Sequence, residues 1–165
     1  MKKKHALVIG ATGASGQEIV NFLLKDPNYD SVTIFVRRKV DKRNVKLNVN
    51  VIDFSQLHLC KDLIKGDVLF SALGTTIKDA GSKDKQYLVD YTYQYEFAKI
   101  ASENGVDTLS LISSIGANKK SAFFYPKIKG KLEESVKLLP FKKIQIYQPP
   151  SLIRQVELIR FGEKV

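Results

Sequence analysis

The stretch HALVIGATGASGQEIVNFLL, from His5 to Leu24, decides the fold. It begins with an apolar run of strand length, passes through three glycines spaced three residues apart, and continues into an amphipathic run of helical period. The glycines are Gly10, Gly13 and Gly16. A GxxGxxG pattern alone is a weak signal. Directly between a strand and a helix, however, it predicts a loop that holds the pyrophosphate of a nucleotide.

Physical chemistry explains why such a loop suits a phosphate. Glycine lets the backbone turn tightly and come close to a ligand, while a helix N-terminus offers free N–H groups and the positive end of the helix dipole. Thr12, Ala14 and Ser15 stand between the glycines, and the two hydroxyls can reach phosphate oxygens. The alternative is a strand-to-helix corner that binds no ligand.

Beyond this stretch, apolar runs of strand length alternate with segments of helical period. We expect strands at 5–10, 31–36, 48–53, 67–73, 107–114 and 142–148, and helices at 15–25, 55–66, 85–104 and 123–139, with a polar loop at 74–85. Strands that alternate with helices and lack hairpin turns predict a parallel sheet. The expected fold is therefore a three-layer, doubly wound α/β (Rossmann) domain over residues 1–165. Its strand order is 3-2-1-4-5-6, and the ligand crevice lies at the carboxyl ends of the strands.

The composition is that of one soluble globular domain, because 44% of the 165 residues are hydrophobic and 27% are charged. The formal net charge is +10, which predicts a solvated basic surface; polyanion binding is the alternative, although no nucleic-acid motif accompanies the charge. Cys60 is the only cysteine, which excludes an intrachain disulfide and favours a cytoplasmic location. We expect no metal site, and no apolar run approaches the ~18 residues that cross a bilayer.

The end of the second expected strand bears on which dinucleotide is preferred. A site that prefers NAD places Asp or Glu there, to accept a hydrogen bond from the ribose 2′-OH. This chain has Arg37 and Arg38 instead, with no acid before Asp41. Guanidinium groups favour a 2′-phosphate, so we expect NADP(H) as the cofactor, with NAD(H) possible. The alternative is that both arginines are merely solvated.

The motifs GATGASG, VRR, VIDF, SALGTT, LISSIGAN, YPKIKGKLE and YQPPSL follow one another along the chain. As a set, this order resembles that of the atypical short-chain dehydrogenases/reductases, in particular the branch with Tat-interacting-protein-type oxidoreductases and NmrA-like proteins. The resemblance implies further cofactor contacts. Those residues are Asp53 and Phe54 for the adenine, Ala72, Leu73 and Gly74 for the ribose and pyrophosphate, and Pro149, Pro150 and Leu152 for the nicotinamide carboxamide. The alternatives are that Phe54 is a core residue and that the prolines simply end a strand.

A YxxxK pair, Tyr125 and Lys129, stands at the start of an expected helix, downstream of two serines that end the fifth strand. A phenol has a pKa of about 10, too high for efficient proton exchange at neutral pH, and a neighbouring ammonium lowers it. We expect Tyr125 to supply a proton, Lys129 to bond the nicotinamide ribose and Ser114 to polarise the substrate oxygen. Ser113 is the alternative serine, because strand pleating aims only one of the two at the crevice. Together these residues predict hydride transfer to a small carbonyl-like substrate.

Two departures from the family pattern stand out. Pro126 places Tyr125 in the first helical turn or just before it. The chain also stops at RFGEKV, several tens of residues before family members do, so we expect the substrate cover to be short or missing.

The rival hypothesis is a non-catalytic protein that senses NADP(H) and binds a protein partner; a homodimer is also possible. Tyr87, Tyr91 and Tyr95, spaced four apart, predict a packing stripe or a subunit interface.

Overall fold

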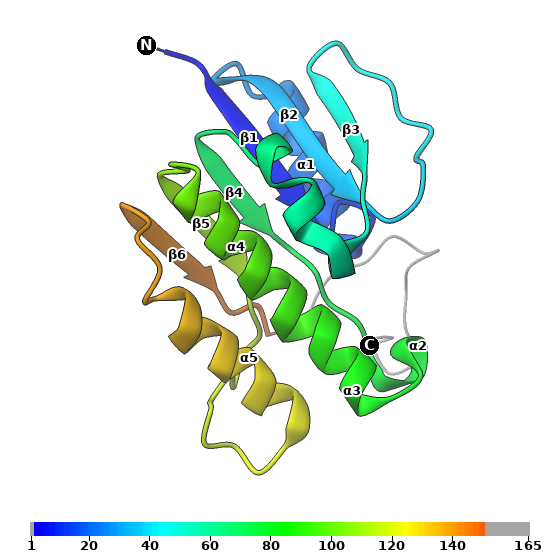
Figure 1. Ribbon diagram of the computed structural model, residues 1–165, viewed down its shortest axis with the longest axis vertical. Coiled ribbons are helices and arrows are strands. Elements are labelled where there is room, and N and C mark those ends of the chain that lie inside the picture. Colours follow the sequence, from blue (N-terminus) through cyan, green and yellow to red (C-terminus); the bar gives the residue numbers. More distant parts are fainter. Residues whose placement is uncertain (1, 151–165) are drawn as a thin grey trace.

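The structure is a computed structural model, and it describes residues 2–150. In this part of the chain six parallel strands form one sheet in the order β3-β2-β1-β4-β5-β6. Helix α1 lies behind this sheet, while α4 and α5 cover its front face (Figure 1). The doubly wound α/β fold and its strand order are thus confirmed. The bounds are β1 (Lys4–Ile9), α1 (Ala14–Lys25), β2 (Tyr29–Val36), β3 (Leu47–Val51), β4 (Val68–Ser71), α4 (Tyr93–Glu103), β5 (Thr108–Ile112), α5 (Phe124–Val136) and β6 (Lys143–Tyr147).

The sheet separates two apolar clusters. Ala6 and Val8 of β1 belong to the cluster on the α1 face, whereas Leu7 and Ile9 belong to the cluster under α4 and α5. Alternate side chains of this buried strand therefore point to opposite faces, and both faces are covered. This explains why β1 reads as a continuous apolar run rather than as an alternating one.

The connection between β3 and β4 differs from the expected helix at 55–66. It consists of two 3₁₀ segments, η1 (Phe54–Leu59) and η2 (Lys61–Leu63). Asp53 begins η1 by accepting a hydrogen bond from the backbone N–H of Ser55. The apolar spacing predicted a helical turn here, but not that the turn would be the tighter 3₁₀ form.

The segment at 74–85, expected as a polar loop, contains the short helix α2 (Ile77–Ala80) and the start of a second one, α3 (Lys83–Tyr87). Helix α3 runs on through a π-helical segment, η3 (Leu88–Thr92), into α4. The expected helix at 85–104 is therefore three consecutive helical segments. A π turn contains an extra residue, so it changes which side chains of the helix face the sheet.

Because all six strands are parallel, their carboxyl ends meet at one edge of the sheet. Backbone hydrogen bonds tie these ends together in pairs. The N–H of Ala72 donates to the carbonyl of Ile9 at 3.0 Å, and the N–H of Ser113 donates to the carbonyl of Tyr147 at 2.7 Å. The loops after β1, β4, β5 and β6 leave from this edge, where a doubly wound sheet binds its ligand.

Candidate cofactor and catalytic site

The loop after β1 is held by backbone contacts that require glycine at two of its three positions. Gly10 has a φ of +79°, and a Cβ there would overlap the backbone of Ala72 and Leu73. A Cβ at Gly16 would overlap the carbonyl of Gly10. These two glycines are therefore needed to bring β1, α1 and the end of β4 together, whether or not a ligand binds.

Gly13 is different, because the fold leaves room beside it. A Cβ at Gly13 would meet only the carbonyl oxygen of Gly10, at 3.4 Å, which is an ordinary contact. Gly13 is also the N-cap of α1, and in the described chain no side chain caps this helix and its first turn holds no acid. Open space next to uncapped N–H groups is what a diphosphate needs, so this loop fits the phosphates of a dinucleotide.

The remaining loop residues lie around the same opening. Thr12 is exposed, whereas Ala14 and Ser15 are half-buried. Ala14 and Ser15 line a cavity of about 560 Å³ together with Pro149, which follows β6. The structure thus brings the glycine loop and the segment after β6 to one cavity, while contact of Pro149 with a nicotinamide stays a prediction. Pro150 is exposed, and Leu152 lies outside the described residues.

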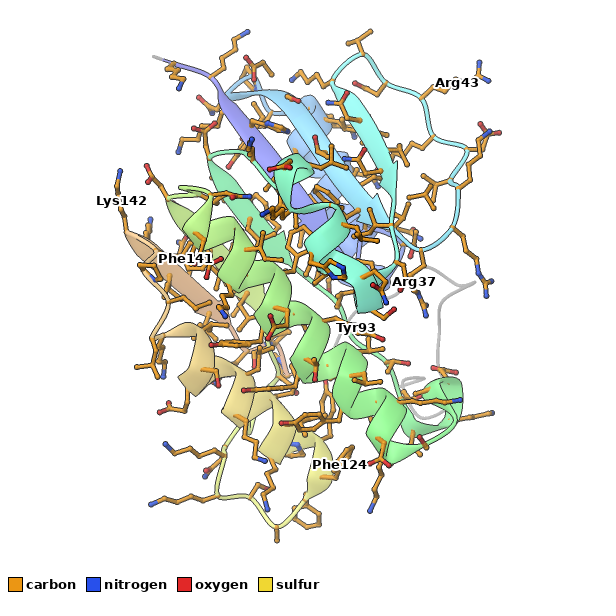
Figure 2. The ribbon with its side chains drawn as sticks, in the orientation of Figure 1. Arg37, Arg43, Tyr93, Phe124, Phe141 and Lys142 are labelled. Atoms are coloured by element: carbon orange, nitrogen blue, oxygen red, sulfur yellow. The ribbon has the colours of Figure 1, made fainter. Side chains whose placement is uncertain are left out.

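Arg37 and Arg38 are exposed directly after β2. Ile9 of β1 is the register partner of Phe35 of β2, so the glycine loop and the arginines leave the sheet side by side. Figure 2 shows Arg37 near the carboxyl end of β2 and Arg43 farther along the connection to β3. The two arginines therefore lie beside the loop that fits a diphosphate.

Asp53 and Phe54 occupy different environments after β3. Asp53 is exposed, and its Oδ1 accepts hydrogen bonds from Ser55 Oγ at 2.7 Å and from Ser55 N at 2.8 Å. These hydrogen bonds lower the pKa of Asp53. Phe54 is buried, and its ring lies 5.9 Å from that of Tyr93 and 6.3 Å from that of Phe97, between centroids. The packing role that the sequence left open for Phe54 is therefore present.

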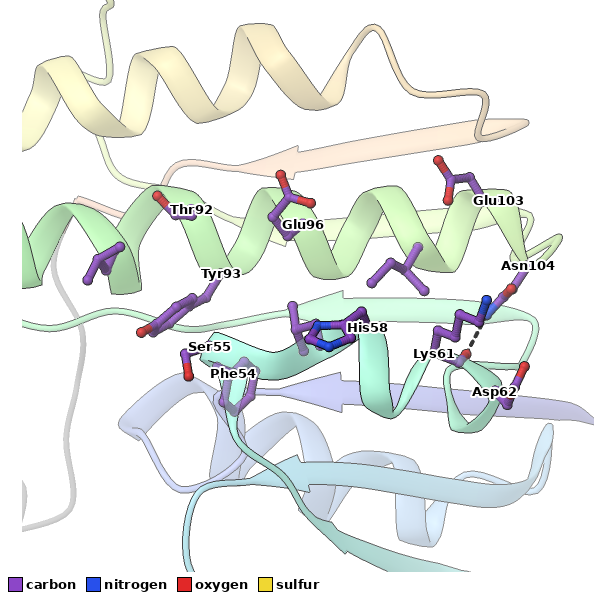
Figure 3. A pocket seen from close by; sticks show the side chains of 13 residues that line it. Phe54, Ser55, His58, Lys61, Asp62, Thr92, Tyr93, Glu96, Glu103 and Asn104 are labelled. Atoms are coloured by element: carbon purple, nitrogen blue, oxygen red, sulfur yellow. Dashed lines mark hydrogen bonds between the residues drawn. The ribbon is translucent and has the colours of Figure 1, made fainter.

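A groove of about 740 Å³ runs between η1 and η2 on one side and α4 on the other. Figure 3 shows it from close by, with side chains of both walls turned toward it. At one end, the side-chain amide of Asn104 donates to the carbonyl of Lys61 at 2.7 Å. The labelled side chains of the walls include Phe54, Ser55, His58, Thr92, Tyr93 and Glu96.

The end of β4 reaches the glycine loop. Ala72 and Leu73 are half-buried, and their backbone lies against Gly10. Gly74 is exposed and leads into Thr75, whose N–H donates to a carboxylate oxygen of Asp90 at 3.1 Å. The structure therefore places these predicted residues beside the loop that fits a diphosphate.

The YxxxK pair spans the first two turns of α5. Tyr125 lies in the first turn, just before Pro126, and is 38% exposed. Lys129 is 1% exposed, and its Nζ donates to the carbonyl of Ile112, the last residue of β5, at 3.4 Å. The ammonium is therefore held at the carboxyl end of β5, while Tyr125 stands nearer the surface.

The two serines after β5 have separate surroundings, as strand pleating predicts. Ser113 is buried, and its hydroxyl donates to Glu133 on α5. Ser114 is half-buried, and its hydroxyl donates to the carbonyl of the next residue, Ile115, at 3.3 Å. Since Ser113 is engaged beneath α5, Ser114 is the better candidate for contact with a substrate.

The sequence analysis missed two buried carboxylates next to Lys129. Asp90, in η3, is fully buried with Oδ1 3.9 Å from Lys129 Nζ. Glu133, one turn after Lys129, accepts from Ser113 and, at 2.8 Å, from the side-chain amide of Gln148. Burial lowers the pKa of Lys129, while Asp90 and then Glu133 oppose this change. The spacing of four from Lys129 could have pointed to Glu133, but nothing local points to Asp90.

The three tyrosines, at the end of α3, in η3 and in α4, form a packing stripe beside α5. Ring centroids are 5.0 Å apart for Tyr87 and Tyr91, and 5.9 Å apart for Tyr91 and Tyr95. The hydroxyl of Tyr91 lies 2.9 Å from that of Ser135 on α5. The packing interpretation of this stripe is confirmed.

Comparison with known proteins identifies the family of this chain. Residues 10–137 match the family of NAD(P)H-binding domains. The chain is 37% identical over 150 residues to Protein FMP52, mitochondrial, of Debaryomyces hansenii, covering 90% of this chain and 66% of that protein. It is 32% identical over 167 residues to Protein HTATIP2 of Rattus norvegicus, covering 99% of this chain and 69% of that protein. The chain thus spans about two thirds of the length of these relatives.

Solved structures share the fold at low identity. The WbmH enzyme of Bordetella bronchiseptica, in complex with NAD+, superposes with a TM-score of 0.78 at 14% identity, over 93% of this chain and 58% of its own. MoeE5, in complex with UDP-glucose and NAD, gives a TM-score of 0.71 at 16% identity, over 87% of this chain and 53% of its own. At these identities the similarity shows the fold alone.

The expected cytoplasmic location is contradicted by these relatives. The FMP52 proteins of Debaryomyces hansenii, Candida albicans and Saccharomyces cerevisiae are named mitochondrial. A single cysteine excludes an intrachain disulfide but does not distinguish between compartments that keep thiols reduced, which is why the inference was wrong. Across residues 2–150, no helix has both the length and the apolar character needed to span a membrane.

The fold, the glycine loop and the relatives lead to one assignment. The sheet order and the loop after β1 are those of a Rossmann domain, and the family match covers most of the chain. The chain belongs to the NAD(P)H-binding family, is homologous to HTATIP2 and FMP52, and shares the Rossmann fold of a solved NAD-bound enzyme.

Proposed function

We propose that this chain binds NADP(H) and transfers a hydride to a small carbonyl-like substrate. One observation carries the proposal. The buried ammonium of Lys129 bonds the carbonyl that ends β5, Ser114 follows that strand, and Tyr125 lies one turn before Lys129 on α5. A phenol, an ammonium and a hydroxyl at the edge that holds the cofactor are the groups that carbonyl reduction needs.

The residues that would hold the cofactor follow from their places. Gly13 and the first turn of α1 would bind the diphosphate through backbone N–H groups. Arg37 and Arg38 would bind the 2′-phosphate, since both are exposed beside the loop. When bound, a reduced nicotinamide supplies a hydride to the carbonyl carbon of the substrate.

The side chains of the protein supply the proton and hold the charge. The hydroxyl of Ser114 donates to the carbonyl oxygen of the substrate and polarises the bond. Tyr125 gives its phenolic proton to that oxygen, which completes the alcohol, and the phenolate takes a proton back from solvent. The ammonium of Lys129 favours the phenolate and bonds the ribose hydroxyls.

The test is NADPH oxidation by the full chain against a panel of small aldehydes and ketones. Tyr125→Phe should reduce kcat by ~100-fold or more without weakening NADPH binding. Tyr95→Phe is the matched control, because Tyr95 belongs to the packing stripe, and it should keep its activity. A wild type that binds NADPH but shows no substrate-dependent oxidation would overturn hydride transfer and favour the NADP(H)-sensing alternative.

Cofactor preference has its own test, a calorimetric titration with NADPH and with NADH. Replacing Arg37 and Arg38 by Glu should weaken NADPH binding by about tenfold or more and change NADH binding much less, because only NADPH carries the 2′-phosphate. Arg43→Glu controls for a charge reversal in the same connection. Equal weakening of both cofactors would refute the role of the two arginines.

A further inference from the structure

Asp90 joins two parts of the site that are far apart in the sequence. Its Oδ2 accepts a hydrogen bond from the backbone N–H of Thr75, in the loop after β4, at 3.1 Å. Its Oδ1 lies 3.9 Å from the Nζ of Lys129 on α5. Both Asp90 and Lys129 are buried, with exposed fractions of 0% and 1%, so this contact is shielded from solvent.

Two side chains of the helical stretch that follows it bind the loop after β4. One turn before Asp90, the side-chain amide of Gln86 donates to the carbonyl of Thr75 at 3.0 Å. Side chains therefore bond both the backbone N–H and the backbone carbonyl of Thr75. Gly74 is also close, because a Cβ placed there would lie 3.5 Å from Asp90 Oδ1. Asp90 therefore touches the stretch that borders the predicted cofactor site.

The backbone of Asp90 is fixed as well. Asp90 lies in the π-helical segment η3, and its carbonyl accepts a hydrogen bond from the side-chain amide of Gln94 at 3.0 Å. Gln94 in turn accepts from the hydroxyl of Ser71 on β4 at 2.8 Å. These hydrogen bonds link the backbone of Asp90 to β4, at a helical irregularity of the kind that is frequent at functional sites.

Two carboxylates and one carbonyl face the ammonium. Asp90 comes from η3, Glu133 from α5 itself, and the carbonyl of Ile112 from β5. Glu133 already accepts hydrogen bonds from Ser113 and Gln148. Burial lowers the pKa of Lys129, and Asp90 is the larger of the two influences that raise it.

We propose that Asp90 is the positioning residue for Lys129. It keeps the buried ammonium charged and holds it beside the loop after β4. This role rests on the proposed function, because the charge on Lys129 matters there for ribose binding and for the proton transfer by Tyr125. A neutral residue at position 90 would let Lys129 lose its proton at a lower pH. The pH at which cofactor binding weakens, as Lys129 loses its charge, would then also be lower than in wild type.

The test compares wild type, Asp90→Asn and Ser102→Ala. Asparagine keeps the size and an acceptor for Thr75 but removes the charge. Ser102→Ala instead removes a hydrogen bond from a buried hydroxyl on α4 to the carbonyl of Lys99, and it leaves the contacts of Asp90 described above in place. The measurements are NADPH affinity by calorimetry over a pH series and an NMR titration of the Lys129 amine, assigned by its loss in Lys129→Met. In Asp90→Asn both titrations should shift down by about one pH unit or more. Ser102→Ala should shift neither titration.

The outcomes separate this proposal from the proposed function. If the Lys129 amine of Asp90→Asn titrates at the same pH as in wild type, Asp90 is not the positioning residue, even if the variant still binds NADPH. If wild type binds no NADPH at any pH, the proposed function fails, and the NMR titration still decides whether Asp90 holds the charge. If Asp90→Asn does not fold, Asp90→Asn/Lys129→Met should fold better, because it removes both members of the pair. A double variant no more stable than Asp90→Asn would overturn the pairing.

Discussion

The glycine loop and the surroundings of Lys129 lie at the same edge of the sheet but are built in opposite ways. In the loop, backbone packs on backbone, and Gly10 and Gly16 leave no space for another atom. Around Lys129, side chains meet side chains, and an ammonium is buried beside the carboxylates of Asp90 and Glu133. The first region should therefore be sensitive to added volume, and the second to altered charge.

The largest effect should follow from adding one methyl group to the loop. Gly10→Ala combines a φ of +79° with overlap against the backbone of Ala72, and neither strand can move without breaking the sheet. We expect a loss of about 4 kcal/mol in the free energy of unfolding, measured by urea denaturation.

Gly116→Ala is the matched control for this change. Gly116 also has a positive φ, of +75°, but a Cβ there meets nothing within 4 Å. Its cost should be only that of the left-handed backbone, about 1 kcal/mol. Equal losses for the two variants would mean that backbone strain, and not close packing, makes glycine necessary at Gly10.

The second effect should follow from removing the buried positive charge. Lys129→Met keeps most of the side-chain volume but leaves Asp90 and Glu133 without their cation, so we expect a loss of about 3 kcal/mol. Lys127→Met, at an exposed position of the same helix, should change the unfolding free energy by less than about 0.5 kcal/mol. If the two variants were equally stable, the charge on Lys129 would not hold this cluster together.

A substitution at Gly13 should change cofactor affinity and not stability, in contrast to a substitution at Gly10 in the same loop. Gly13→Ala fits the space available and removes a glycine from a helix boundary, so the unfolding free energy should stay within about 1 kcal/mol of wild type. The added methyl group would stand beside the uncapped N–H groups of α1, so we expect NADPH to bind about tenfold more weakly. Unchanged affinity in calorimetry would argue against a diphosphate at this loop.

The sequence predicted the loop and the sheet because their signals are local. A glycine spacing next to a buried apolar run specifies both the strand and the turn, as Ala6 to Ile9 and Gly10 show. The 3₁₀ form of η1 was not predicted, since Leu57, Cys60 and Ile64 have the spacing of an ordinary helix. Packing, which the spacing does not contain, decides between the two forms.

The cluster around Lys129 could be predicted only in part. The YxxxK pattern found Lys129, and pleating indicated that the two serines differ, but alternation alone could not say which one faces α5. Asp90 lies in a helical pattern where Gln86 and Gln94 are also polar, and polar residues at that spacing normally face solvent. Gln94 and Asp90 are buried where they bond β4 and α5, and Gln86 where it bonds the loop after β4; no local pattern encodes these contacts between distant segments.

The smallest effect should come from an exposed ion pair on the same helix as Lys129. Glu134 accepts from Lys137 at 3.1 Å and from Lys119 at 3.4 Å, and these hydrogen bonds lower the pKa of Glu134 below 4.5. The folded state thus binds a proton less readily than the unfolded state, so any stabilisation is present above pH 4.5 and is lost as the pH falls through the folded pKa. Urea denaturation of Glu134→Gln should show a small loss at neutral pH that disappears in acid and in high salt. A loss as large as that of Lys129→Met would mean that burial does not set the strength of charge pairing on α5, and the contrast between the two regions would then rest on packing alone.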